Sequence, residues 1–196
     1  RSFEPVVRGS AEDRRDGSYA CSYTVLTSGS WLLSAVDERS GRHVQGSPWS
    51  VYVAAGPTHP PSSELVGEEL LLAAAGSTVT FDVVSRDRRG NRQLYGGEPW
   101  QASLTGPMPH PAPLDVRLDD RQDGSYGCAY VPTAAGEYIL SVTLRGVHVR
   151  RSPLRITIAP TRVHPHSCGA HGHGLRAARR GLPACFTVVG RDAFGN

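Results

Sequence analysis

Histidine and cysteine gather near the C-terminal end of the sequence, in the stretch HPHSCGAHGHGLRAARRGLPAC. Zinc takes four nitrogen or sulfur ligands, and alternate residues of an extended strand point the same way, so His166 and Cys168 could reach one ion. His171 and His173 are the other two metal candidates. The stretch contains no C-x-x-C pair. We therefore expect no metal and no cofactor.

The motifs of common catalytic sites are missing from the sequence. There is no G-x-S-x-G, no P-loop, no H-E-x-x-H and no G-x-G-x-x-G. The acidic pairs Asp119–Asp120 and Glu68–Glu69 stand beside turns, where solvated carboxylates are the rule, and glycosidase chemistry would also need a sugar cleft between two carboxyl groups. We expect a protein that is not an enzyme.

Several stretches of the sequence recur at a fixed spacing along the chain. The stretch DGSYACSY at Asp16 returns as DGSYGCAY at Asp123, and FDVVSRDRRGN at Phe81 returns as FTVVGRDAFGN at Phe186. Repeats spaced by roughly a hundred residues are whole domains. The chain is therefore expected to hold the C-terminal part of one unit (1–55), a complete unit (56–160) and the N-terminal part of a third (161–196).

The complete unit consists of short strands separated by turns. Alternating apolar residues, as in STVTFDVV, indicate strands with one buried face, and Gly90, Asn91 and the pair Asp123–Gly124 mark turns. The seven expected strands cover 70–73, 77–87, 100–105, 113–119, 125–130, 136–144 and 152–158. EELLLAAA would also suit a helix by propensity alone. The pattern predicts an all-β chain of tandem seven-stranded immunoglobulin-like β-sandwiches.

Two further positions fit such a sandwich. Tyr138, two residues after Gly136, stands where a tyrosine corner would form. Cys21 and Cys128 each lie between two inward tyrosines, which predicts a small buried residue with an inert thiol. Because the two cysteines belong to different units, they should not pair, and a reducing compartment is favoured.

The order of motifs resembles the filamin (actin-binding protein 280) repeat. It runs F-x-V-V-x-R-D-x-x-G-N, G-G-x-P-W, a strand ending in G-P, D-G-S-Y-x-C-x-Y-x-P, G-x-Y, and G-V-H-V-x-x-S-P-L-x-I-x-I. The resemblance implies a filamin-type sandwich of the E-set kind, and it explains Cys168 and Leu175 as part of an opening strand. In such repeats ligands bind in the groove between the third and fourth strands. The matching residues here are Trp100, Gln101, Ala102, Ser103, Leu104, Thr105, Leu114, Val116 and Leu118.

The resemblance also implies the kind of partner. An edge strand has unpaired N–H and C=O groups, so a partner protein could add an extended segment to it as a further strand. The proline-rich insert PMPHPAP, between the two groove strands, is expected not to pair and to cap the groove or form its lip. Contact with actin would require regions outside this chain.

Charge and hydropathy limit the classes of partner that we expect. The formal net charge of +3 comes from arginines that alternate with acidic residues, so we expect no nucleic-acid binding, although LRAARRG could touch a phosphate. No apolar run reaches 18 residues, so we expect no membrane contact in this part of the protein.

The leading hypothesis is a non-enzymatic scaffold whose repeats space and bind proteins in the cytoplasm, the cytoskeleton or a cilium. One alternative is an adhesion protein similar to plant and algal gamete-surface proteins, which would carry a leader and a transmembrane segment. Another is a tripartite-motif ubiquitin ligase, which would carry a RING domain and normally a single repeat.

Overall fold

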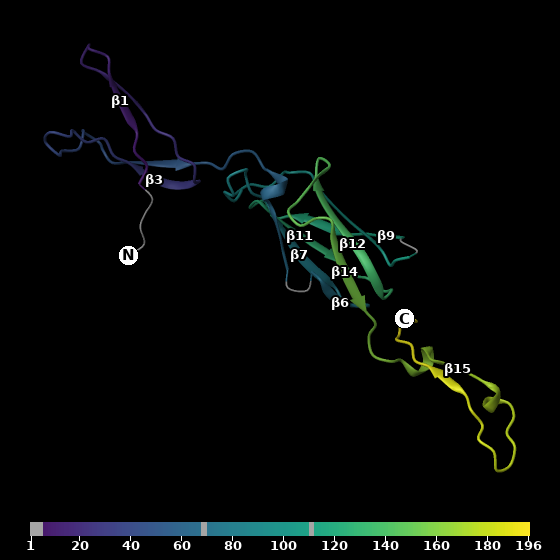
Figure 1. Ribbon diagram of the computed structural model, residues 1–196. Helices are drawn as coiled ribbons and strands as arrows, with labels where there is room; N and C mark the ends of the chain where they lie inside the picture. The colour runs from purple at the N-terminus through teal and green to yellow at the C-terminus, as the bar shows by residue number, and fades with distance from the viewer. Residues whose placement is uncertain (1–5, 68–69, 110–111) are drawn as a thin grey trace.

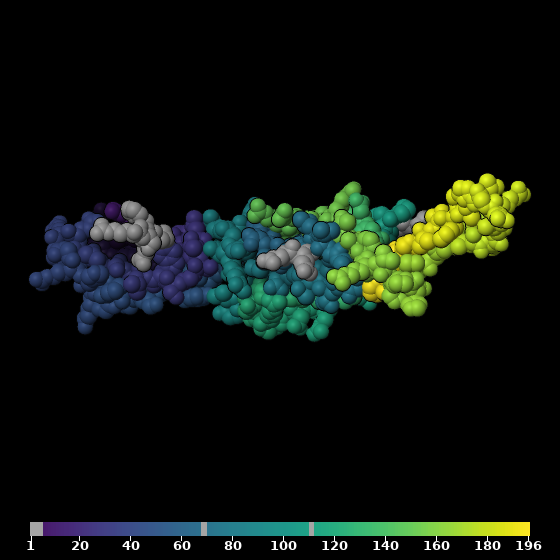
Figure 2. All heavy atoms as spheres, turned by 90° about the horizontal axis from the view of Figure 1, so that it is seen from below, coloured from purple at the N-terminus to yellow at the C-terminus, as the bar shows by residue number. Residues whose placement is uncertain are grey.

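The computed structural model describes residues 6–67, 70–109 and 112–196. Regular structure in this part of the chain consists of strands and of short 3-10 turns. A central β-sandwich lies between an N-terminal pair of hairpins and a C-terminal hairpin, and the three parts follow one another along a rod (Figure 1). The space-filling view in Figure 2 shows the same succession, with the slender C-terminal segment at one end.

The strands fall into the three parts as follows. The N-terminal hairpins contain β1 (Ser10–Asp13), β2 (Tyr19–Ser22), β3 (Gly29–Leu33) and β4 (Trp49–Val53). The central sandwich contains β5 (Glu64–Val66), β6 (Leu72–Ala74), β7 (Val79–Val84), β8 (Trp100–Gly106), β9 (Ala112–Leu114), β10 (Arg117–Asp120), β11 (Ser125–Tyr130), β12 (Gly136–Leu144), β13 (Val147–His148) and β14 (Leu154–Ala159). The C-terminal segment contains β15 (Gly169–His171) and β16 (Thr187–Val189). The 3-10 turns are η1 (Pro60–Ser62), η2 (Pro165–Ser167) and η3 (His173–Leu175).

Two sheets form the central sandwich. One has the order β10-β11-β7-β5, and the other has the order β6-β14-β12-β8-β9, with β13 paired to β12. All pairs are antiparallel except β6 with β14. The chain opens in one sheet with β5 and continues in the other with β6. The predicted single opening strand at 70–73 therefore becomes two short strands, of which the sequence pattern missed β5.

The sheets pack because apolar residues occupy every second position. In β7, Val79, Phe81 and Val83 are buried while Thr80 is exposed, and β12 alternates in the same way over nine residues. The apolar core residues of the described chain all lie between Leu70 and Ile158. Burying a large aliphatic or aromatic side chain contributes about 1.5–3 kcal/mol, so the central sandwich holds the stabilising core.

Local features of the sandwich confirm several predictions. Tyr138 donates a hydrogen bond from its hydroxyl to the Ala134 carbonyl at 2.9 Å, which is a tyrosine corner. Gly90 and Gly124 have φ values of 87° and 80°. Asn91, which could also have adopted a positive φ in this turn, does not, and its side chain donates a hydrogen bond to the Leu26 carbonyl.

The flanking hairpins have no core of their own among the described residues. The large side chains of Leu32, Tyr52 and Val188 are more than half exposed. Cys21, which we expected to be buried like its equivalent Cys128, is exposed because β1 and β2 pair only with each other.

The described residues contain no helical segment that could span a lipid bilayer.

Candidate functional site

Strand β8 presents two different faces. Trp100 and Leu104 are 5% and 0% exposed and belong to the core, whereas Gln101 and Ser103 are exposed on the outer face. The Trp100 indole N–H donates to the Ser85 hydroxyl at 3.0 Å, which fixes this end of the strand. Of the predicted groove residues, Trp100 and Leu104 therefore support the strand from inside and offer no surface to a partner.

The neighbouring strand was predicted as one element over 113–119 and is two. Strand β9 pairs with β8 in one sheet, while β10 pairs with β11 in the other. Asp115 and Val116 carry the chain from one sheet to the other, which is how sandwich edges are often closed. Period-two alternation continues through this crossing, so it does not reveal the break.

The insert PMPHPAP also differs from its prediction. Ala112 and Pro113, its last two residues, pair with Gly106 and Thr105 of β8, although we expected no pairing. A proline is tolerated there because β9 is an edge strand and needs N–H donors on one side only. His110 and Pro111 lie outside the described residues.

These strands bound an open side of the sandwich. Strands β8 and β9 border it in one sheet and β10 borders it in the other, and β8 and β10 approach each other there. The half-buried apolar residues on this side pack against the core and are Ala102, Leu114, Val116 and Leu118. The predicted groove residues from the two strands are thus brought together, with a partly exposed apolar lining.

The outer edge of β8 is only partly covered. Strand β9 pairs with Leu104, Thr105 and Gly106. In the described chain no strand pairs with the remainder of this edge, from Trp100 to Ser103. Its backbone groups can therefore accept a short added strand.

A shallow hollow in the described part of the molecule lies on the other sheet. A shallow cavity of about 720 Å³ covers the outer face of the sheet that contains β7 and β11. It exists because Thr80, Gly127 and Ala129 are small, and it contains the ion pair between Arg121 and Asp82, with N–O distances of 2.6 and 2.8 Å. The hydrogen bond and charge of Asp82 raise the pKa of Arg121.

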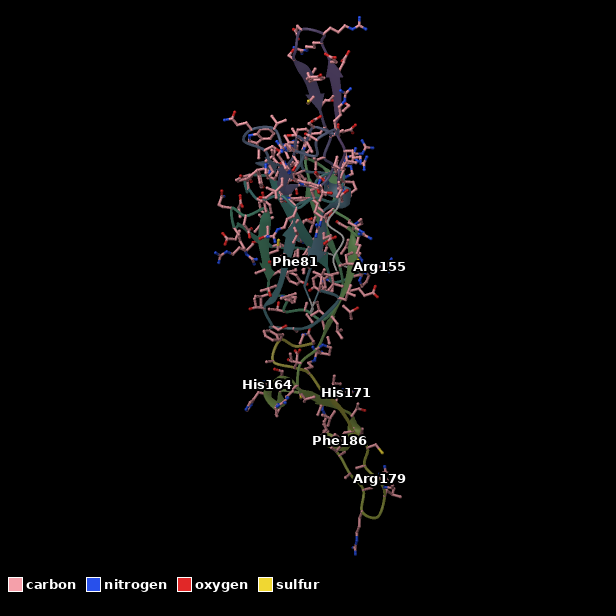
Figure 3. The ribbon with its side chains drawn as sticks, turned by 90° about the vertical axis from the view of Figure 1, so that its left-hand side faces the viewer. Phe81, Arg155, His164, His171, Arg179 and Phe186 are labelled. Carbon is pink, nitrogen blue, oxygen red and sulfur yellow. The ribbon has the colours of Figure 1, made fainter. Side chains whose placement is uncertain are left out.

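The metal candidates follow one another along the C-terminal segment. Figure 3 shows His164 at the turn that begins this segment and His171 further along, toward Phe186, with Arg179 near the far tip. Cys168 donates from its thiol to the His164 carbonyl at 3.2 Å and accepts from the Arg191 N–H at 3.4 Å. Among the described residues, no three His, Cys, Asp or Glu side chains are grouped as metal ligands would be.

Several histidines contact a serine three or four residues later, an arrangement that could suggest a nucleophile and its base. His148 Nδ1 lies 2.9 Å from the Ser152 hydroxyl, which also accepts the Val142 N–H at 2.8 Å. The Ser152 hydroxyl thus stabilises the loop to which Ser152 belongs. His43 with Ser47, His59 with Ser62 and His164 with Ser167 make the same contact.

Cys128 matches its prediction as an inert thiol. It lies between Tyr126 and Tyr130 in the core and is 2% exposed. Burial raises its pKa to about 12, so the thiol is protonated at neutral pH and is a poor nucleophile.

One set of interacting residues was not predicted from the sequence as a site. Asp87 and Asn91, in the loop after β7, bind each other and reach into the N-terminal hairpins, and Asp192 and Asn196 do the same toward the central sandwich. The available signal was the return of R-D-x-x-G-N after 105 residues, which we used to define the repeat and to place a turn, without assigning a role to its aspartate and asparagine.

Comparisons with known proteins agree with this architecture. The chain is 31% identical over 98 residues to the E3 ubiquitin-protein ligase TRIM71 of Bos taurus, which covers 50% of this chain and 11% of the ligase. It is 28% identical over 191 residues to filamin-C of Rattus norvegicus, which covers 94% of this chain and 6% of filamin-C. The chain thus corresponds to a small part of each relative. The solved structure of the Escherichia coli adhesin FdeC shares the fold, with a TM-score of 0.63 at 19% identity over 97% of this chain and 59% of that one.

The family match covers the central sandwich. A model described as the Filamin/ABP280 repeat matches residues 57–155, which is half of the chain and runs from the residue before the Thr58 bridge into β14. The tyrosine corner, the Gly124 turn and the two-sheet topology lie within this range. The chain belongs to the Filamin/ABP280 repeat family.

Proposed function

We propose that this chain is a non-enzymatic scaffold segment in which filamin-type repeats space and bind partner proteins. In this proposal 1–55 and 161–196 are parts of further repeats on either side of a repeat at 56–160. The recurrence of the same motifs after 105 and 107 residues, together with the alignment to filamin-C along 94% of the chain, supports it. We place the protein in the cytoplasm, at the cytoskeleton or in a cilium.

The observation that carries the binding role is the partly unpaired edge of β8 beside the half-buried apolar side chains of Ala102, Val116 and Leu118. A partner segment would add as a strand along Gln101–Ser103 and place alternate side chains between the sheets, against Ala102, Val116 and Leu118. Backbone hydrogen bonds would supply affinity, and the groove would select side chains. Because β9 already occupies Leu104–Gly106, the added strand must be short.

The partner is best sought as a peptide with alternating apolar residues. A displayed library of random peptides is selected against the full chain, and each binder is mapped by changes in backbone amide resonances. We expect the largest changes at Gln101–Ser103. Changes confined to β5 and β6, at the opposite side of the sandwich, or a library that yields no binder, would contradict the proposal.

A pair of substitutions separates groove binding from general binding. Ala102→Asp places a carboxylate beside the apolar peptide, and the cost of desolvating it should weaken binding by a few kcal/mol. Leu72→Asp, at a side chain that is 64% exposed on β6, is the matched control and should leave affinity unchanged. Urea denaturation of both variants checks that the sandwich remains folded. Equal affinity of the two variants would place the binding site elsewhere.

A further inference from the structure

The loop after β7 connects the central sandwich to the N-terminal hairpins through one asparagine. Asn91 donates from Nδ2 to the Leu26 carbonyl at 3.0 Å and accepts the Ser28 N–H on Oδ1 at 3.1 Å. The second proton of Nδ2 goes to Asp87 Oδ2 at 2.8 Å, and the same carboxylate accepts the N–H of Gly56 in the connecting segment at 2.9 Å. The loop, the connecting segment and the preceding hairpin are thus held at one point.

The same set of bonds recurs at the other end of the sandwich. Asn196 donates to the Thr133 carbonyl at 3.0 Å and accepts the Ala135 N–H at 2.7 Å. It also donates to Asp192 at 2.8 Å, and Asp192 accepts the N–H of Thr161 at 3.0 Å. The bonds at the two joints therefore correspond atom for atom, with the partners 105 or 107 residues apart.

The chemistry of the loop requires these residue types. A carboxamide has one acceptor atom and two donor protons, and Asn91 uses all three. Asp87 holds it in place, since its Oδ1 atom also accepts the N–H groups of Arg89 and Asn91 at 2.8 and 2.9 Å. Because both oxygens of Asp87 accept hydrogen bonds from the chain, this carboxylate stabilises the joint and is not arranged to bind a cation.

The first joint is not closely packed throughout. A cavity of about 250 Å³ remains beside it, lined by Val25, Val53, Ala54 and Arg88 among others. At the second joint Phe194, which is 48% exposed, lies against Gly76 and adds an apolar contact. The carboxamide bonds are the feature that both joints share.

We propose that the R-D-x-x-G-N loop is a docking element, and that its partner is a loop of the preceding repeat, the one just before β3 at the first joint and just before β12 at the second. The asparagine binds a carbonyl and an N–H two residues apart in that loop. The aspartate accepts a backbone N–H of the connecting segment. Successive repeats are thereby joined at a fixed angle. The joint forms whether or not a peptide binds along β8.

The test uses hydrogen exchange of backbone amides in the full chain, followed by NMR. We expect Asn91→Ala to remove protection of the Ser28 amide by about tenfold and to leave the Ala135 amide unchanged. Asn196→Ala should instead reduce protection of the Ala135 amide and leave the Ser28 amide unchanged. Each variant is therefore the control for the other. The indole N–H signal of Trp100, which is hydrogen-bonded inside the sandwich, reports whether the sandwich is folded.

Two results would overturn the proposal. One is a wild-type chain in which neither the Ser28 nor the Ala135 amide is protected. The other is a pair of variants that lose no protection. If Asn91→Ala disturbs the sandwich itself, Asn196→Ala still decides, because Asn196 lies outside the sandwich. Backbone relaxation of β3 and β12 should further show common tumbling in the wild type and separate tumbling in Asn91→Ala.

Discussion

Gly124 and Cys128 are both buried around strand β11, yet they tolerate change differently. Gly124 has a φ of 80°, and a Cβ atom there would collide with the backbone carbonyl of Gln93. We expect Gly124→Val to cost at least about 1–3 kcal/mol from backbone strain alone. Cys128→Val exchanges one small buried group for another and should cost less than about 1.5 kcal/mol. Urea denaturation of the full chain measures both values.

Equal losses in the two variants would show that either the turn or the thiol has a different role. Gly124→Ala is a useful intermediate, since it adds a Cβ atom without β-branching and meets the same Gln93 carbonyl. Its stability should lie between that of the wild type and that of Gly124→Val.

At the scale of single elements, we expect the loop from Asp87 to Asn91 to make the free energy of unfolding sensitive to acid. Burial by itself raises the pKa of Asp87, but hydrogen bonds from the Asn91 side chain and from the N–H groups of Gly56, Asn91 and Arg89 outweigh it and hold the pKa below 3.8. A carboxyl whose pKa is lower in the folded state stabilises the fold at every pH above its unfolded value. That contribution decreases as the pH falls below 3.8 and is lost once the pH passes the folded value.

The comparison of wild type with Asp87→Asn isolates this carboxyl from the others. We expect Asp87→Asn to lose about 1–3 kcal/mol, because buried N–H donors lose their charged acceptor. The difference in free energy of unfolding should be constant from neutral pH to about 5 and should shrink as the pH falls through 3.8. A difference that already shrinks between neutral pH and 5 would contradict the assigned cause.

The sequence predicts elements well where alternation and burial agree. Strands β7, β11 and β12 were found because each keeps one face in the core along its whole length. The break between β9 and β10 was missed because Leu114, Val116 and Leu118 keep the alternation while the chain changes sheets. The groove residues could be named from the family resemblance, but their pairing and the burial of Leu104 depend on tertiary structure. The role of Asn91 was missed because its partners lie in another segment.

At the scale of the whole molecule, stability is concentrated in the middle. The core lies between Leu70 and Ile158, while the tips of the flanking hairpins, which carry Arg14 and Arg179, are exposed. Brief trypsin digestion of the full chain should therefore leave a resistant fragment near 56–160, identified by mass spectrometry. Digestion in urea, where the sandwich is unfolded, is the control and should leave no such fragment. Flanks that survive as long as the centre would show that they are stabilised in a way the described structure does not explain.

The joints use only backbone atoms of the preceding segment. Leu26 and Ser28 at one joint are replaced by Thr133 and Ala135 at the other, and the asparagine bonds are the same. The asparagine bonds can therefore form with any neighbour that has this loop geometry, whatever side chains the loop carries. Duplication, deletion or exchange of whole units during evolution would leave each new boundary with a complete set of bonds. The length of such a protein can therefore change in whole units while the asparagine bonds at each boundary are kept.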